Sequence, residues 1–301
     1  MMGTTKMDYD ERAFFFDCEG DSLPGIVACP RESDDATRAA GAARLGVLIV
    51  GAGLQYRIGP HRQSVLLARA LAAAGAPCMR FDHRGAGDAT GAARSFESLQ
   101  ADIRAALDAF FAEAPTLAGV MLWGFGDGAS AAVFYAGADA DPRLDGLLLL
   151  NPWMHAGARV FRHGFLRHLH LHAFRDFFDA GAVPARALRE WWRARRGGGR
   201  KRDDLALPGG GEALPEQMRL FLQALSIPWW VILSGQDEFV REFDRVAASP
   251  AWANLFPARA PYRLPDPCPA FSSAAWRDAV VGKTLACVDA VAGIMKLLKS
   301  S

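Results

Sequence analysis

Short apolar runs alternate with segments of helical periodicity along most of the chain. The runs are rich in Val, Ile and Leu, which is typical of strands buried on both faces of a parallel sheet. They are residues 46–50, 77–81, 120–123, 144–150 and 229–233, with a weaker run at 260–264. The predicted helices are 60–74, 96–113, a segment that follows the 120–123 run and ends at about 136, and 272–298. This alternation predicts a parallel sheet with right-handed crossovers and helices on both faces. Residues 13–30 instead predict two antiparallel strands around a turn.

Glycines at alternate positions follow the run that ends at Trp123, and a segment of small residues begins directly after them. This layout is that of a nucleophile elbow, the tight strand-to-helix turn that presents the catalytic side chain in α/β-hydrolases. The strained turn needs small residues two positions before and two positions after its centre, and Gly124 and Gly128 meet that need. The central residue is Gly126, which has no side chain to act as a nucleophile.

We therefore expect an α/β-hydrolase fold, with a mostly parallel sheet, helices on both faces and a helical lid insertion. Residues 13–151 and 227–298 would form the two parts of the core, and residues 152–226, where the alternation breaks, the lid. An insertion there would lie over the carboxyl ends of the strands, where open α/β sheets bind ligands. A dimer face or simple decoration is the alternative interpretation of this segment.

Composition narrows the classes of function. Apolar residues make up 51% of the chain and the net charge is +1, so we expect a globular core and no preference for nucleic acid or an anionic membrane. Five scattered cysteines without C-x-x-C spacing predict neither a zinc site nor a disulfide framework. Residues 1–12 lack a signal-peptide hydrophobic region, and no apolar run approaches the ~18 to 20 residues of a membrane span. A cytoplasmic protein without metal or cofactor is the expectation.

A hydrolase of this fold needs an acid and a histidine after the nucleophile in chain order. Asp237, just past the 229–233 run, is the candidate acid, with capping of the next helix as its alternative role. The histidine is missing, because none of the seven histidines lies beyond residue 172. A Ser or Cys nucleophile depends on an adjacent base. The nucleophile and the base are therefore both absent, which argues against a triad of the usual kind.

Five motifs resemble a known family, the exosortase A system-associated hydrolases of type 1. They are GAGLQYRIGPHRQ at 51–63, FDHRGAGD at 81–88, WGFGDGAS at 123–130, LNPW at 150–153 and FSSAAWR at 271–277. The resemblance covers about residues 13–298 and is weakest in the insertion. It implies a bacterial ester or thioester hydrolase encoded near acyl carrier proteins. It also implies that the family's Cys nucleophile falls on Gly126 and its base His on Pro269, while Asp237 keeps the acid position.

Other residues could replace the missing groups, but the alternatives are weak. Asp127 could be a carboxylate nucleophile only if the turn shifted, which would put Phe125 at a position that needs a small residue. A carboxylate at the positive end of the helix dipole is its simpler role, and Ser130 is expected to be buried against the sheet. Helical geometry divides the insertion's four histidines, His163, His168, His170 and His172, between opposite faces, so they cannot all bind one metal ion. A surface site of two histidines is the alternative that this geometry leaves open.

Backbone donors could survive the loss of the nucleophile. The N–H of Asp127, with that of Gly53 or Leu54, could form an oxyanion hole. Gln55, Tyr56 and Arg57 in the same loop, with His61 and Arg62, could recognise a polar or anionic group, or could simply pack the loop. Asp82 and Arg84 are expected to pair within their turn, and the basic run 196–202 is expected to be a solvated loop.

Two functions follow from these residues. One is a hydrolase of the resembled family that is weak or inactive. The other is a non-catalytic protein that binds an acyl or carboxyl ligand, or an acyl carrier protein. Neither nucleic acid nor a membrane is an expected partner.

Overall fold

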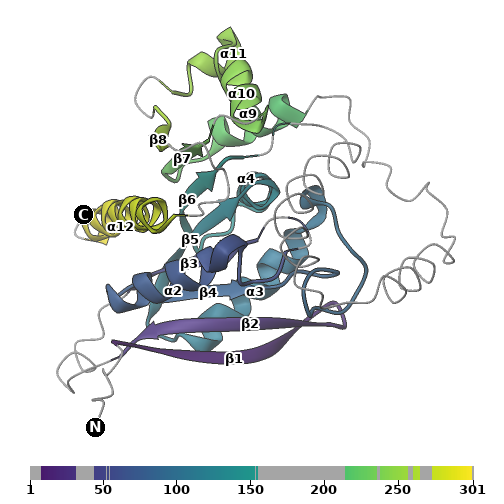
Figure 1. Ribbon diagram of the computed structural model, residues 1–301, viewed down its shortest axis with the longest axis vertical. Helices are drawn as coiled ribbons and strands as arrows, with labels where there is room; N and C mark the ends of the chain where they lie inside the picture. Colours follow the sequence, from purple (N-terminus) through teal and green to yellow (C-terminus); the bar gives the residue numbers. More distant parts are fainter. Residues whose placement is uncertain are drawn as a thin grey trace, which may run out of the picture. The chain divides into compact units, whose positions relative to one another are not determined.

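The computed structural model describes residues 8–31, 44–51, 53, 55–152, 154, 214–235, 238–256, 260–264 and 273–299. Within them, eight strands form one sheet in the order β1-β2-β4-β3-β5-β6-β7-β8 (Figure 1). The strands are β1 Tyr9–Cys18, β2 Asp21–Pro30, β3 Arg44–Val50, β4 Cys78–Phe81, β5 Leu117–Phe125, β6 Leu144–Leu150, β7 Trp229–Ser234 and β8 Tyr262–Leu264. Strands β1 and β2 pair antiparallel, and so do β2 and β4. Every pairing from β4 across the sheet to β8 is parallel.

Helices cover both faces of this sheet (Figure 1). On one face, α2 (Gln63–Ala73) contacts α12 (Ala274–Lys299), and on the other α3 (Gln100–Glu113) contacts α4 (Asp127–Asp139). The short helices η1 (Pro60–Arg62) and η2 (Phe96–Ser98) lead into α2 and α3. Successive residues of a strand point to opposite faces of the sheet. Ile49 and Trp123 point to the face of α2 and α12, where they pack in one core with Leu67 and Val288. Burial on both faces explains why these strands are uniformly apolar.

Three further helices lie in the C-terminal half, namely α9 (Leu214–Ala224), α10 (Glu238–Ala247) and α11 (Pro250–Ala253). The sequence pattern did not resolve α9 and α11. Every strand predicted from the sequence is confirmed within a few residues at each end, and so are the four predicted helices, which correspond to α2, α3, α4 and α12. The lid is not confirmed, because residues 155–213 of the predicted 152–226 insertion lie outside the described residues.

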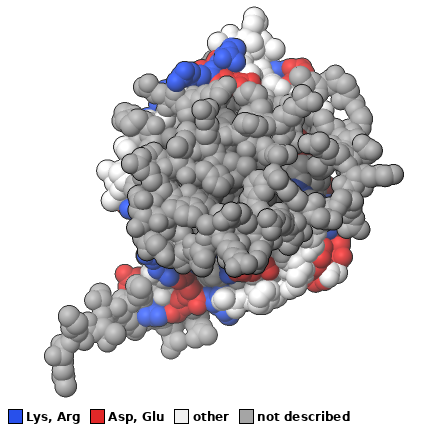
Figure 2. Space-filling model, turned by 45° about the vertical axis from the view of Figure 1, so that its right-hand side comes forward, with Lys and Arg blue, Asp and Glu red and all other residues white. Residues whose placement is uncertain are grey.

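The chain divides into two compact units, residues 1–154 with 217–301, and residues 155–216. The first contains the whole sheet. None of the described helices is long and apolar enough to span a membrane. In Figure 2 Lys and Arg are seen beside Asp and Glu around the edge of the view, where described residues are visible. This mixing agrees with the small net charge of the sequence.

Candidate active site

The turn between β5 and α4 has the geometry that the glycine spacing predicts. Gly126 lies at its tip with φ 60° and ψ −124°, in a region that L residues with a side chain rarely adopt. Its carbonyl oxygen accepts the first helical hydrogen bond, from the N–H of Ala129 at 3.1 Å. The turn therefore holds residue 126 at the point where the strand becomes a helix, with no side chain to present.

The glycines on either side of the tip are required by close backbone contacts. A Cβ atom on Gly124 would lie 2.4 Å from the Cα of Ala129. A Cβ atom on Gly128 would lie 2.4 Å from the carbonyl oxygens of both Val50 and Gly51. Both distances are too short for any side chain. Residue 126 is therefore the centre of the elbow, and a register shifted to Asp127 is wrong.

Asp127 is the first residue of α4, and its carboxyl group faces backbone N–H groups from two segments. Burial raises the pKa of this carboxyl to about 7, while hydrogen bonds from the N–H groups of Gly53, Asp127 itself and Gly128 oppose the rise. Gly53 belongs to the loop after β3, whereas Gly128 belongs to the helix. Two of these N–H groups, those of Gly53 and Asp127, are predicted oxyanion-hole donors, so the Asp127 carboxyl group lies near the predicted oxyanion hole.

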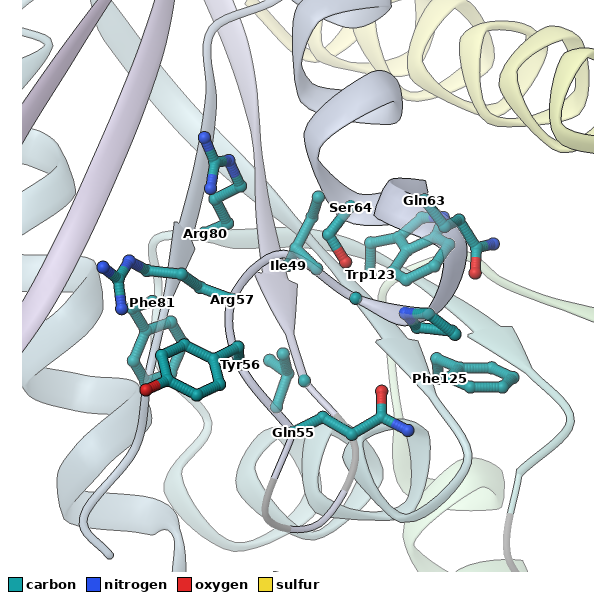
Figure 3. A pocket seen from close by; sticks show the side chains of 14 residues that line it. Ile49, Gln55, Tyr56, Arg57, Gln63, Ser64, Arg80, Phe81, Trp123 and Phe125 are labelled. Atoms are coloured by element: carbon teal, nitrogen blue, oxygen red, sulfur yellow. The ribbon is translucent and has the colours of Figure 1, made fainter. Parts of the chain in front are cut away.

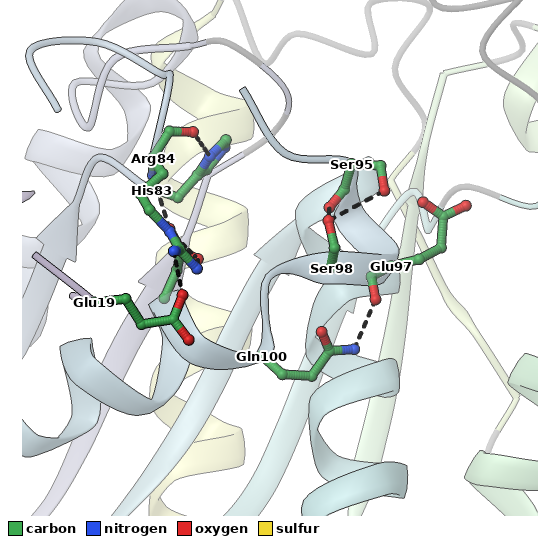
Figure 4. Close-up of polar contacts among 8 residues, drawn as sticks. Glu19, His83, Arg84, Ser95, Glu97, Ser98 and Gln100 are labelled. Atoms are coloured by element: carbon green, nitrogen blue, oxygen red, sulfur yellow. Dashed lines mark hydrogen bonds and ion pairs between the residues drawn. The ribbon is translucent and has the colours of Figure 1, made fainter. Parts of the chain in front are cut away.

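His83 contacts the loop after β3 that contains Gly53. Its ring is buried, and Nε2 lies 2.7 Å from the carbonyl oxygen of Gly53. Nδ1 lies 3.2 Å from the carbonyl oxygen of Arg84, as Figure 4 shows. A ring nitrogen that carries hydrogen can donate to the Gly53 oxygen. This contact fixes the residue whose N–H faces Asp127. No role for His83 follows from the sequence alone, although its position in the turn directly after β4 indicates that it lies at this edge of the sheet.

The loop residues expected to recognise a ligand are held by acidic neighbours. The backbone N–H of Arg57 donates to Asp82 at 2.5 Å, and its guanidinium bonds Asp82 and Asp88. The hydroxyl of Tyr56 donates to Asp88 at 2.9 Å. These contacts favour the loop-packing alternative for Tyr56 and Arg57. A binding role for them, and for Gln55, stays a prediction.

Arg84 makes a buried ion pair with a helix on the second face. Its guanidinium donates to both carboxylate oxygens of Asp102 in α3, the shortest contact being 2.8 Å. It also bonds Glu19 at the β1–β2 turn (Figure 4). Both Arg84 and Asp102 are almost completely buried. The predicted pairing of Asp82 with Arg84 is therefore wrong. Each side chain instead ties its turn to a different neighbour, because the turn directs Asp82 toward the 55–57 loop.

A small pocket opens beside the same strand ends, on the face covered by α2 and α12 (Figure 3). It is narrow, with room for about one water molecule between the 55–60 loop and the aromatic rings of Trp123 and Phe125. Gln63 and Arg80 line it, and each has a buried side-chain nitrogen without a hydrogen-bond partner among the described residues. The wall therefore combines aromatic rings with polar side chains.

Comparisons with known proteins agree with this geometry. The family described as serine aminopeptidase, S33, matches residues 59–191, which is less than half of the chain. An esterase from Pyrococcus furiosus has a TM-score of 0.57 at 13% identity, covering 92% of this chain and 90% of its own. Est1E from Butyrivibrio proteoclasticus has a TM-score of 0.54 at 15% identity, covering 96% of this chain and 100% of its own.

A bacterial brefeldin A esterase, described as a homologue of human hormone sensitive lipase, has a TM-score of 0.60. It is 17% identical, and the match covers 98% of this chain and 80% of the esterase. The chain has the α/β-hydrolase fold. No curated protein matches the sequence. At identities this low, the structural similarity shows the fold alone, and the chemistry has to be inferred from the residues of the site.

Several predicted positions of the hydrolase site lie outside the described residues. They are Leu54, the acid position Asp237 and the base position Pro269. The insertion's histidines also lie outside, and no group of three or more His, Cys, Asp or Glu among the described residues could hold a metal ion. Ser130, the other alternative nucleophile, is completely buried, as predicted.

The described part of this hydrolase-fold site has backbone donors for a ligand's carbonyl oxygen, and it has no nucleophile at residue 126 to attack the carbonyl carbon. It keeps the turn, the backbone donors and the loop supports. It lacks a side chain at Gly126.

Proposed function

We propose that this protein is a degenerate α/β-hydrolase of the exosortase A-associated type that binds an acyl group without turnover by a triad. The observation that carries the proposal is Gly126 at the tip of a well-formed elbow. A triad acts through an oxygen or sulfur atom at this position, and glycine has neither. The absence of any histidine after residue 172 supports the same conclusion, because the activating base would lie there.

The ligand class follows from what remains. Backbone N–H groups that converge from a loop and a helix start bind a carbonyl oxygen in hydrolases of this fold. Gly53 and Asp127 supply such N–H groups here, and Gly124 and Gly128 let the two backbones approach closely enough to form the site. We infer that the ligand carries an acyl carbonyl group as an ester or a thioester. An acyl carrier protein is the macromolecular partner that this chemistry would fit.

Reaction with an activated ester tests the proposal. Purified protein mixed with p-nitrophenyl octanoate should release no stoichiometric burst of p-nitrophenol, because no acyl-enzyme can form at Gly126. The Gly126→Cys variant is the matched control, since it restores a nucleophile at the same backbone position. A burst from the wild-type protein that equals one p-nitrophenol per chain would refute the proposal.

A working hydrolase with an unorthodox site is the second candidate. The observation that favours it is the pKa of Asp127, which burial raises to about 7, the range in which a carboxyl group can act as a general base. This candidate predicts steady turnover that the Asp127→Asn substitution abolishes. Equal rates for the wild-type protein and this variant would exclude it.

A further inference from the structure

The narrow pocket beside the carboxyl ends of β3 and β5 contains hydrogen-bond donors that the protein itself does not use. Gln63 and Arg80 line it, and both residues are more than nine-tenths buried. Gln63 Nε2 and Arg80 Nε have no hydrogen-bond partner among the described residues. A buried donor without a partner has lost its hydrogen bonds to water, which lowers the stability of the folded protein. An acceptor from a ligand would restore what these donors have lost.

The two donors differ in how they are held. The guanidinium of Arg80 is anchored by Glu11, which accepts a hydrogen bond from Nη2 at 3.1 Å. Gln63 is the first residue of α2 (Figure 3), and its side-chain nitrogen has no such anchor in the part of the chain that the structure describes. Gln63 is therefore the pocket residue whose hydrogen-bonding capacity is least accounted for by the fold.

The size of the pocket and the type of its unpartnered atoms define the occupant. There is room for about one water molecule, which admits a single oxygen atom and excludes a phosphate or carboxylate group. Both unpartnered atoms are donors, and a carbonyl oxygen is an acceptor that brings no hydrogen of its own. A hydroxyl group or a water molecule brings hydrogens that need acceptors in turn. A carbonyl oxygen therefore fits the pocket best.

The pocket adjoins the predicted oxyanion hole. Gly51 lines it two residues before Gly53, and Phe125 lines it two residues before Asp127. Two residues span at most about 7 Å of chain, which a few covalent bonds of a ligand cover. A ligand whose ester or thioester carbonyl lies at the predicted donors can thus place a second carbonyl oxygen in the pocket.

We propose that Gln63 is a specificity-determining residue of the acyl site, and that the site prefers an acyl group with a second carbonyl close to the first, as in a 3-oxoacyl thioester. This inference rests on the proposed function. The Gln63 amide donates to the second carbonyl oxygen when the ligand binds. The complex thereby gains a hydrogen bond that the free protein lacks, and a plain acyl chain cannot supply it.

Calorimetric titration at pH 7 tests the inference with S-(3-oxooctanoyl)-N-acetylcysteamine and S-octanoyl-N-acetylcysteamine. The wild-type protein should bind the 3-oxo thioester roughly tenfold more tightly, as expected for one hydrogen bond to a buried donor. Gln63→Met keeps the length of the side chain and removes the donor, so this variant should bind the two thioesters equally. Gln63→Leu should do the same.

Stability separates this role from a structural one. Gln63→Met should unfold at the same urea concentration as the wild-type protein or at a higher one, because the buried amide nitrogen has no partner to lose. Gln100→Met is the matched control. Gln100 is the first residue of α3, and its amide donates to the carbonyl oxygen of Glu97 at 2.8 Å (Figure 4). This substitution should lower the urea midpoint and leave the preference for the 3-oxo thioester unchanged.

The inference and the proposed function fail in different ways. Equal binding of the two thioesters by the wild-type protein overturns the inference alone, and so does a preference that either Gln63 variant retains. If both Gln63 variants are less stable than the wild-type protein or do not fold, the amide already has a structural partner, and the inference is overturned as well. Absence of binding of either thioester overturns the proposed function and the inference with it. Thiol release from either probe by the wild-type protein overturns the proposed function.

Discussion

Replacement of Asp127 by Asn should make the protein more stable at pH 8 than the wild-type protein, and equally stable near pH 4. Burial raises the pKa of the Asp127 carboxyl from 3.8 to about 7 in the folded protein. Between these two values the folded state binds a proton that the unfolded state has lost, so the free energy of unfolding falls as the pH rises. Each unit of pKa difference corresponds to about 1.36 kcal/mol. The wild-type protein should therefore lose about 4 kcal/mol across this window through Asp127 alone.

Urea denaturation followed by tryptophan fluorescence measures the effect at pH 4, 6 and 8. The other carboxyl groups titrate alike in both proteins, so the difference between wild type and Asp127→Asn isolates one residue. We expect this difference to be near zero at pH 4 and to grow in favour of the variant up to about pH 8. A difference that is constant with pH, or that favours the wild-type protein at pH 8, would show that the carboxyl group is not held in a site that disfavours its charge.

Three further predictions follow from the contacts around the elbow. Gly124→Ala and Gly128→Ala should each lower the free energy of unfolding by about 1–3 kcal/mol, because the new Cβ would meet backbone atoms at 2.4 Å. Gly282→Ala is the control in the same denaturation assay, because its Cβ would meet nothing within 4 Å. Arg84→Ala should lower the free energy of unfolding by about 3–5 kcal/mol, because it leaves Asp102 buried and unpaired. Glu19→Ala should lower it by less than about 1 kcal/mol, because that carboxylate is mostly exposed. Equal losses would be inconsistent with the Arg84–Asp102 pair as the main contact. His83→Ala should weaken binding of S-octanoyl-N-acetylcysteamine, because the loop at Gly53 loses its hydrogen bond to the His83 ring. His83→Gln should retain more affinity, because its amide can still donate to the Gly53 carbonyl oxygen. If calorimetry shows that both variants bind like the wild-type protein, His83 does not have this role.

The elbow could be predicted because its requirements are local. A buried strand, a helix start and three glycines at alternate positions lie within about ten residues, and the close contact between Gly128 and the end of β3 follows from the parallel pairing of β3 with β5. The parallel strands could be predicted for a similar reason, since a strand buried on both faces is uniformly apolar.

The polar contacts of the site could not be predicted from spacing, because they join residues far apart in sequence. Asp102 lies in an amphipathic helix where an exposed carboxylate is the ordinary expectation, and only the fold shows that Arg84 covers it. Arg57 likewise looked available to a ligand, because the sequence did not place Asp82 and Asp88 against it. Sequence patterns record which side chains are polar, and the fold decides which of them face each other.

Repair of the two lost positions tests the central claim most directly. The measurement is the rate of thiol release from S-octanoyl-N-acetylcysteamine by the wild-type protein and by Gly126→Cys combined with Pro269→His. We expect no release above background from the wild-type protein. The double variant should show a clear gain, of the order of 10² or more from a restored nucleophile and base, although a side chain at φ 60° should cost it about 1–2 kcal/mol of stability. Thiol release by the wild-type protein at a rate that the double variant does not exceed would contradict the claim that an intact cleft has lost only its attacking group and base.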